Sequence, residues 1–218
     1  MKKRVLSIVL TLAIILLMPN YNANACESNL TYKLDVPDLT ELTVAVYGTE
    51  PVYNEGGTNI SSAIRNGVTA WNYTGGAFVN IEFTNYAYYN NANYTVVVVF
   101  YDQDSDFAGG CMLYKSNGVR VNAGDGYPSP TQDWNYCIIR IHTNNIKVRT
   151  EGLRPVQALG AHECGHALGL RHCDTISHNS IMFNSAFEVY YYNNNYITAP
   201  TNTDRSLLFN LYSIIPNI

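Results

Sequence analysis

The run from His162 to His172 contains residue types at a spacing suited to binding a metal ion. It reads H-E-x-x-H-x-x-G-x-x-H, so His162 and His166 would share one face of a helix, because they are four residues apart. Glu163 would lie at the edge of that face. Gly169 can adopt the left-handed backbone conformation that ends a helix. The turn would then bring His172 back as a third imidazole.

Three neutral imidazoles are typical of a catalytic zinc site, because they leave one position of a four-coordinate ion open for water. Glu163 is placed to act on that zinc-bound water as the general base, and the activated water can attack a peptide carbonyl. H-E-x-x-H alone is a weak signal, whereas the added Gly and third His at fixed offsets make coincidence improbable. The sequence therefore predicts Zn²⁺ bound by His162, His166 and His172, with Glu163 as the catalytic residue.

The first 25 residues have the pattern of a signal peptide. Basic residues at positions 2–4 precede an apolar run over 5–18, and Ala23-Asn24-Ala25 supplies a small-x-small cleavage site. The alternative, a membrane anchor, is disfavoured because the run is shorter than the ~18 residues that a spanning helix needs. We expect cleavage after Ala25 and secretion to the extracellular space, with the style of the basic region indicating a bacterium.

Residues 26–218 have a length that suits one catalytic domain, which we expect to act as a monomer. Loss of the three basic residues of the signal peptide leaves 10 Lys+Arg against 17 Asp+Glu, a net charge of about −7. An acidic chain is a poor partner for nucleic acid or for an anionic membrane surface. We therefore expect a protein or peptide as the partner, with no nucleic acid.

The mature chain keeps five cysteines, an odd number. Cys111 and Cys137 fall on two strands expected to be neighbours, which predicts a disulfide between them. Cys164 either pairs with Cys173 or is a small buried apolar residue. Cys26 has two special alternatives, a lipid anchor or a latch on the metal. Without that lipid we expect no stable association with a membrane.

Hydrophobic patterning predicts an α+β domain in which helices pack on a mixed sheet. Strands are expected at 42–47, 78–84, 94–101 and 136–141, after a short extended segment at 30–34, and helices at 60–71, 156–168 and 204–212. The strand at 94–101 contains four consecutive valines and should be central in the sheet. Asn117-Gly118 predicts a tight hairpin turn between the apolar runs 111–114 and 119–121. Trp71 reads as a core residue.

Asp102, Asp104 and Asp106 alternate just after the expected central strand. Alternating carboxylates in a loop can bind Ca²⁺, although the Gly and Glu of an EF-hand loop are missing at later offsets. The alternative is a solvated acidic loop. Calcium at these three residues is thus a second metal hypothesis.

The region from His162 to Met182 resembles the metzincin zinc metallopeptidases, especially the matrixin branch. The resemblance is carried by the histidine signature, by Gly165 to Leu170 within it, and by Ser180-Ile181-Met182, which is similar to a Met-turn. It implies a zincin-like domain with a mainly parallel twisted sheet, an active-site helix, a Met-turn that packs beneath the metal, and a C-terminal helix at 204–212. It also implies a specificity pocket walled by residues 183–200.

Two departures from the matrixin pattern change the expectation. Asn184 stands where some metzincins place a Tyr ligand, so we expect three protein ligands only. Few residues separate the signal peptide from the first extended segment, which leaves little room for a prodomain. The sequence thus predicts a secreted zinc-dependent endopeptidase. The alternative is a secreted zinc-containing binding or toxin-like module on the same scaffold without significant proteolysis.

Overall fold

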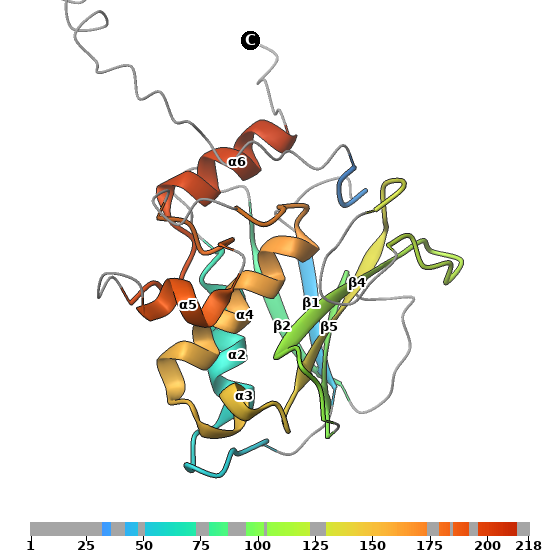
Figure 1. Ribbon diagram of the computed structural model, residues 1–218. Coiled ribbons are helices and arrows are strands. Elements are labelled where there is room, and N and C mark those ends of the chain that lie inside the picture. Colours follow the sequence, from blue (N-terminus) through green and yellow to red (C-terminus); the bar gives the residue numbers. More distant parts are fainter. Residues whose placement is uncertain are drawn as a thin grey trace, which may run out of the picture.

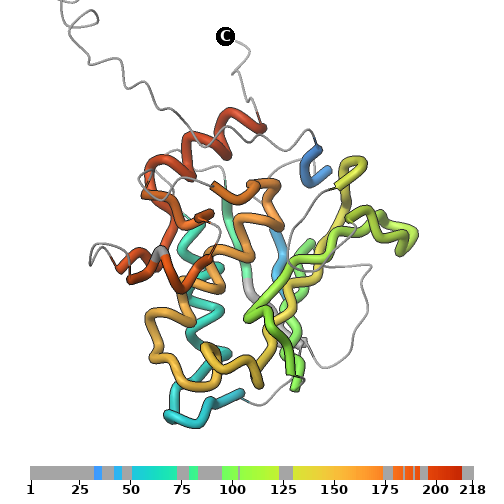
Figure 2. The backbone as a smooth tube through the Cα atoms, viewed as in Figure 1, coloured from blue at the N-terminus to red at the C-terminus, as the bar shows by residue number. Residues whose placement is uncertain are grey.

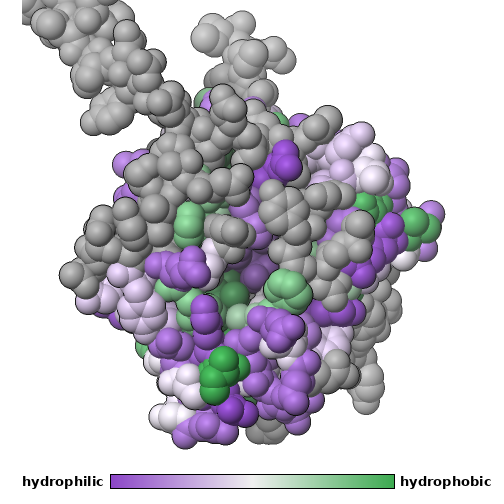
Figure 3. All heavy atoms as spheres, viewed as in Figure 1, coloured by the Kyte–Doolittle hydropathy of each residue, from purple (hydrophilic) through white to green (hydrophobic). Residues whose placement is uncertain are grey.

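The computed structural model describes residues 32–35, 42–47, 51–72, 79–86, 95–102, 104–122, 130–173, 179–183, 185–191 and 196–212. The expected signal peptide, Cys26, the start of the segment at 30–34 and Asn184 lie outside these residues. Within them, no helix is both long enough and apolar enough to cross a membrane. The described surface on one face of the molecule mixes hydrophilic with isolated hydrophobic residues (Figure 3).

In the described part of the chain, five strands form one mixed sheet, which confirms the predicted α+β class. They are β1 (Leu42–Tyr47), β2 (Ile81–Tyr86), β3 (Val96–Tyr101), β4 (Gly109–Tyr114) and β5 (Tyr136–His142), in the order β2-β1-β3-β5-β4. All neighbouring pairs are parallel except β4 with β5, so the sheet is mainly parallel. β4 lies at one edge.

β3 occupies the centre of the sheet, as its valines predicted. Val96 and Val98 belong to the larger hydrophobic core, whereas Val97 and Val99 belong to a second, smaller cluster. Alternate side chains of a strand point to opposite faces, so β3 is buried on both sides. This is why its sequence is continuously apolar rather than alternating.

Helices cover one side of this sheet, with α4 central among them (Figure 1). They are α2 (Ile60–Thr69), α3 (Ile146–Thr150), α4 (Leu153–Ala167), α5 (Ala186–Tyr191) and α6 (Asn202–Tyr212). The three longer helices were expected from periodicity. α3 and α5 were not, because helices of five and six residues carry too few turns for a periodic pattern.

α4 packs closely against α2, which runs beside it in the backbone trace (Figure 2). The contact depends on two glycines. A Cβ on Gly67 would lie 2.1 Å from the backbone oxygen of Gln157, and one on Gly160 would lie 2.7 Å from that of Ile64. The two backbones therefore approach more closely than any side chain would allow. This contact fixes the position of α4 in the core.

Two expected elements are only partly formed. Gly118 has φ +82° in a tight turn, and the amide of Lys115 donates to the carbonyl of Val119, as a hairpin requires. The second arm, however, makes only an isolated bridge between Tyr114 and Arg120 instead of a strand. In the segment expected at 30–34, the described Leu34 likewise makes one isolated bridge, to Trp134. Strand β2 begins at Ile81, later than the expected start at 78.

Candidate metal centre

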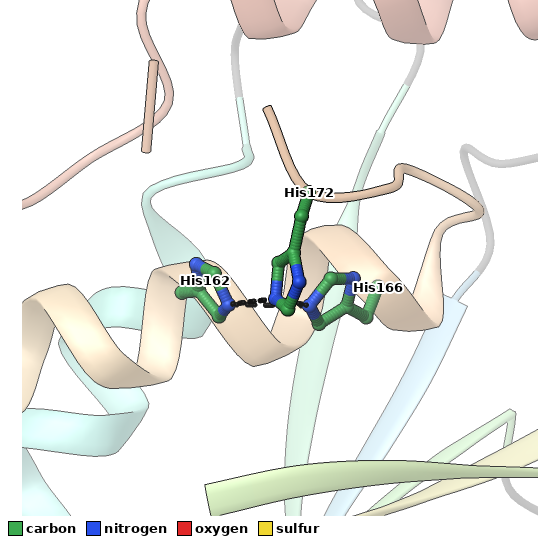
Figure 4. Close-up of side chains that lie close together, drawn as sticks. All are labelled: His162, His166 and His172. Atoms are coloured by element: carbon green, nitrogen blue, oxygen red, sulfur yellow. Dashed lines mark hydrogen bonds between the residues drawn. The ribbon is translucent and has the colours of Figure 1, made fainter. Parts of the chain in front are cut away.

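The structure brings the side chains of His162, His166 and His172 to one point (Figure 4). The first two come from α4 and the third from the segment that follows it. Their Nε2 atoms are 3.1 Å apart for His162 and His166, 3.2 Å for His162 and His172, and 3.0 Å for His166 and His172. All three side chains are buried. Among the described residues, this is the group of His, Cys, Asp and Glu side chains able to share a metal ion.

The far side of each helical imidazole is fixed by a carbonyl oxygen. His162 Nδ1 lies 2.8 Å from the oxygen of Ile181, and His166 Nδ1 lies 2.8 Å from the oxygen of Leu170. A carbonyl only accepts, so both Nδ1 atoms carry the proton, and a neutral imidazole then has a bare lone pair at Nε2. The two Nε2 atoms thus face each other at 3.1 Å with no proton between them.

The electrostatics of the rings agree with neutral imidazoles. Burial, together with the nearby His172, lowers the pKa of His162 to about 3, although the carbonyl of Ile181 acts in the opposite direction. Burial and the two other imidazoles hold the pKa of His166 well below its ordinary value. Protonated rings would therefore be costly here, and a cation between the lone pairs would remove their repulsion.

Zinc fits this donor set. Nitrogen ligands ~2.0–2.1 Å from a tetrahedral ion lie ~3.3 Å from one another. The observed separations of 3.0–3.2 Å are close to that value. Carbonyl partners at Nδ1 are also the usual way in which proteins orient histidines toward a metal. The residues present can accordingly hold one Zn²⁺ through His162, His166 and His172.

Glu163 lies beside this point in a buried environment. Its Oε2 is buried and has no hydrogen-bond partner among the described residues. Burial raises its pKa to about 8. Gly109 on β4 lies against the other oxygen, because a Cβ added there would be 2.9 Å from Oε1. Glu163 is thus a carboxyl group held between α4 and the edge strand, with one oxygen available to a ligand.

Gly169 ends the turn that returns the chain to the histidines. Its φ is +102°, in the left-handed region, and its amide donates to the carbonyl of His166 at 3.0 Å. The next amide, of Leu170, donates to Gly165 at 2.9 Å. These bonds close the end of α4 in the manner of a glycine C-cap. His172 follows three residues after Gly169 and reaches the Nε2 atoms of the helical imidazoles.

Met182 packs against α4 at Gly165, the residue before His166. A Cβ on Gly165 would lie 2.2 Å from the sulfur of Met182 and 3.0 Å from Cζ2 of Trp71. Gly165 therefore leaves the space that the thioether occupies. Trp71 is fully buried in the core, and its indole N–H donates to the carbonyl of Ala161 at 2.9 Å. The α4 turn that carries His162 is thus held from the side by a tryptophan.

Asp204 and Trp134 also act on this region, and sequence reasoning missed both. The indole of Trp134 donates to the carbonyl of Ala167 at 3.1 Å. Asp204 is completely buried, and its side chain accepts a hydrogen bond from the amide of Ile181. A charged residue in an otherwise apolar helix stripe next to Leu207 and Leu208 was the available signal.

A cavity of about 230 Å³ opens next to the histidines. The segment after Met182 contributes Ser185, Ala186 and Phe187 to its wall, within the range where the resemblance implied a specificity pocket. His162, Glu163 and His172 also line it. The rest of the wall comes from the β3–β4 connection, the start of β4, α3 with its N-cap, and α4: Asp106, Phe107, Ala108, Gly109, Asn145, Ile146, Lys147 and Leu159. A ligand in this cavity would touch both the imidazoles and Glu163.

The three aspartates proposed for calcium do not come together as a metal-binding group among the described residues. Asp102, Asp104 and Asp106 are exposed. Asp106 lines the cavity, whereas the other two are not part of its wall. Calcium at these residues stays a prediction.

The predicted disulfide between Cys111 and Cys137 is wrong. Cys111, Cys137 and Cys164 are free thiols, all completely buried. In the β4–β5 register, Cys111 is paired with Ile139 and Cys137 with Leu113, so the two cysteines are diagonal instead of opposite. The free state of Cys164 also excludes the pairing with Cys173 and leaves its alternative, a small buried residue. Burial, then the neighbouring Cys137, holds the pKa of Cys111 well above its ordinary value.

Comparison with known proteins gives little beyond this geometry. No family model matches the chain, and no curated protein matches it. Sixty chains of solved structures match, among them that of "Structure of Myroilysin". The likeness has 15% sequence identity and a TM-score of 0.42, over 84% of this chain and 82% of that one.

Proposed function

We propose that this chain is a zinc-dependent endopeptidase of the metzincin type, similar to matrixins in its histidine signature. One observation carries the proposal. The Nε2 lone pairs of His162 and His166 converge with His172, next to a buried and unpartnered oxygen of Glu163. His162, His172 and Glu163 line the same cavity, whereas His166 is not part of its wall. The expected signal peptide makes the enzyme a secreted one.

Each residue has a distinct part in the reaction. His162, His166 and His172 would hold the ion, and zinc, when bound, polarises the scissile carbonyl and lowers the pKa of water. Glu163 would accept a proton from the attacking water at Oε2 and pass it to the nitrogen of the leaving amine. Its Oε2 has no other hydrogen-bond partner among the described residues, so this oxygen is free to carry the proton between the two steps.

The cavity supports a peptide as the substrate. Leu159, Ala186 and Phe187 supply apolar wall beside the histidines, and Asn145 and Lys147 supply polar groups. Such a wall suits a side chain of the substrate, whose backbone would then lie near Glu163. Protein and peptide substrates are thus favoured over small hydrophilic molecules.

The test is Glu163→Gln, which keeps the size of the side chain and removes the base. We expect zinc content to stay at one per chain and casein hydrolysis to fall by at least the ~10²–10⁴-fold that acid–base catalysis contributes. Glu82→Gln is the matched control, because Glu82 is exposed on β2. Near-normal turnover by the Glu163 variant would overturn the assignment. A wild-type chain that binds zinc and cleaves no protein would favour the binding module instead.

A further inference from the structure

Asp204 is a buried acidic residue that the proposed mechanism does not use. It lies in the first turn of α6 and has no exposed surface. Its Oδ2 accepts from the amide of Ile181 at 3.0 Å, from the amide of Thr201 at 2.7 Å and from the hydroxyl of Thr201 at 2.8 Å. Its Oδ1 accepts from the hydroxyl of Ser180. A buried polar group with this many partners fixes the segments that carry them.

The residues that bond to Asp204 lie in two different parts of the structure. Thr201 precedes α6, and its hydroxyl also accepts from the amide of Asp204 at 3.5 Å, so this contact caps the helix. Ser180 and Ile181 lie instead in the segment beneath the histidines. Ser180 Oγ also accepts from the amide of Met182 at 3.0 Å. One side chain thus joins the start of α6 to the segment from Ser180 to Met182.

Both backbone polar groups of Ile181 are hydrogen-bonded to side chains. Its N–H donates to Asp204, and its carbonyl accepts from Nδ1 of His162 at 2.8 Å. Two hydrogen bonds therefore connect Asp204, through the backbone of Ile181, to the imidazole of His162. The Nδ1 partner decides which nitrogen of the ring carries the proton and how the ring is turned. If the carbonyl of Ile181 moved, His162 would lose that constraint.

We propose that Asp204 is a positioning residue for His162: it holds the backbone of Ile181 so that Nε2 of His162 faces the other two imidazoles. The inference rests on the proposed function only in requiring that the histidines bind a divalent metal. Outer partners of metal-bound histidines typically change metal affinity ~10–100-fold when they are replaced. A helix-capping role alone would change stability and leave the affinity of the folded site untouched.

The experiment measures metal affinity in the full chain after removal of metal by a chelator. Asp204→Asn puts an amide nitrogen where an acceptor is needed, so we expect Zn²⁺ affinity to fall ~10–100-fold in competition with a chromogenic chelator. The Co²⁺ absorption bands should shift as well, because the geometry of His162 changes. Thr201→Val is the matched control: it removes the cap hydroxyl and leaves Ser180 and Ile181 in place, so it should lower the melting temperature and change affinity by less than ~10-fold.

Three results would decide the matter. Equal Zn²⁺ affinity in Asp204→Asn and wild type overturns the inference, and so does an equal loss in Thr201→Val. If Asp204→Asn does not fold, Ser180→Ala serves instead: it removes the hydroxyl that Asp204 binds, and unchanged affinity and Co²⁺ bands would overturn the proposal. A wild-type chain that binds zinc without cleaving casein defeats the proposed peptidase and leaves the positioning result to stand by itself.

Discussion

The histidine site has a helical half and a loop half, and they are held in different ways. His162, Glu163 and His166 belong to α4, where the helix itself sets their relative positions. Among the described residues, His172 and Met182 lie outside the helices and strands, and an isolated bridge joins their neighbours Cys173 and Phe183. Hydrogen bonds from distant residues hold this second half.

The two halves differ in what positions their side chains: local helix geometry in one, contacts with residues distant in the sequence in the other. The helical half needs only that α4 be placed, which the close contact with α2 achieves. The loop half needs the φ of Gly169, the carboxyl group of Asp204, and Tyr212, whose hydroxyl donates to the carbonyl of Leu168 at 2.9 Å. A pattern in the chain can specify the first half, whereas the second depends on tertiary contacts.

The largest expected effect would show whether both halves bind the same ion. We expect His166→Ala and His172→Ala each to reduce Zn²⁺ affinity by more than the ~10–100-fold of an outer-partner substitution, because each removes a direct donor. Chelator competition on the purified chains measures this. If His172→Ala bound zinc with the affinity of the wild type, the loop half would supply no ligand. The division of one metal site into a helical and a loop half would then be wrong.

A second change acts on the helical half through packing. Gly67→Ala places a Cβ 2.1 Å from the backbone oxygen of Gln157, which cannot rotate away. We expect the free energy of unfolding in urea to fall by about 1–3 kcal/mol, as overpacking of a core usually costs. Gly56→Ala is the control, since its nearest neighbour would be a side-chain oxygen of Asn54 at 3.5 Å. Equal stability of the two variants would contradict the role given to the α2–α4 contact.

A third change acts on the loop half through the backbone. Gly169→Ala must hold an alanine at φ +102° and meet Leu211 at 2.7 Å, so we expect a loss of about 1–2 kcal/mol together with weaker Zn²⁺ binding. Gly118→Ala is matched in backbone angle, with φ +82° and open space around the Cβ. It should lose stability and keep metal affinity. Weaker zinc binding in the Gly118 variant would show that strain alone, wherever it lies, is transmitted to the site.

The smallest effect concerns the three buried thiols, one on α4, one on β4 and one on β5. Cys111, Cys137 and Cys164 are fully buried, so we expect a thiol reagent to be excluded from all three in the native chain and to reach them after denaturation. Cys164→Ala should leave Zn²⁺ affinity unchanged, because Cys164 is not part of the histidine group. Rapid labelling of the native protein would show that α4 is less firmly packed than the structure indicates.

Sequence reasoning identified the three histidines and the turn at Gly169 from the spacing of the motif, and the main sheet from hydrophobic patterning. The spacing of His162 and His166 and the valines of β3 each specify a local structure. It missed Asp204, since nothing in the chain pairs residue 204 with residue 181. It also predicted a disulfide between Cys111 and Cys137, because strand neighbours can be guessed from order whereas the register that makes them diagonal cannot.

The contact between Gly165 and Met182 has a consequence for redesign of this protein. The two residues share one volume, since a Cβ at 165 would lie 2.2 Å from the sulfur at 182. Positions 165 and 182 are therefore expected to be epistatic: a larger residue at one is tolerated only with a shorter residue at the other. A library that varies position 165 alone would record it as immutable, although paired changes such as Gly165→Ala with Met182→Ala remain open.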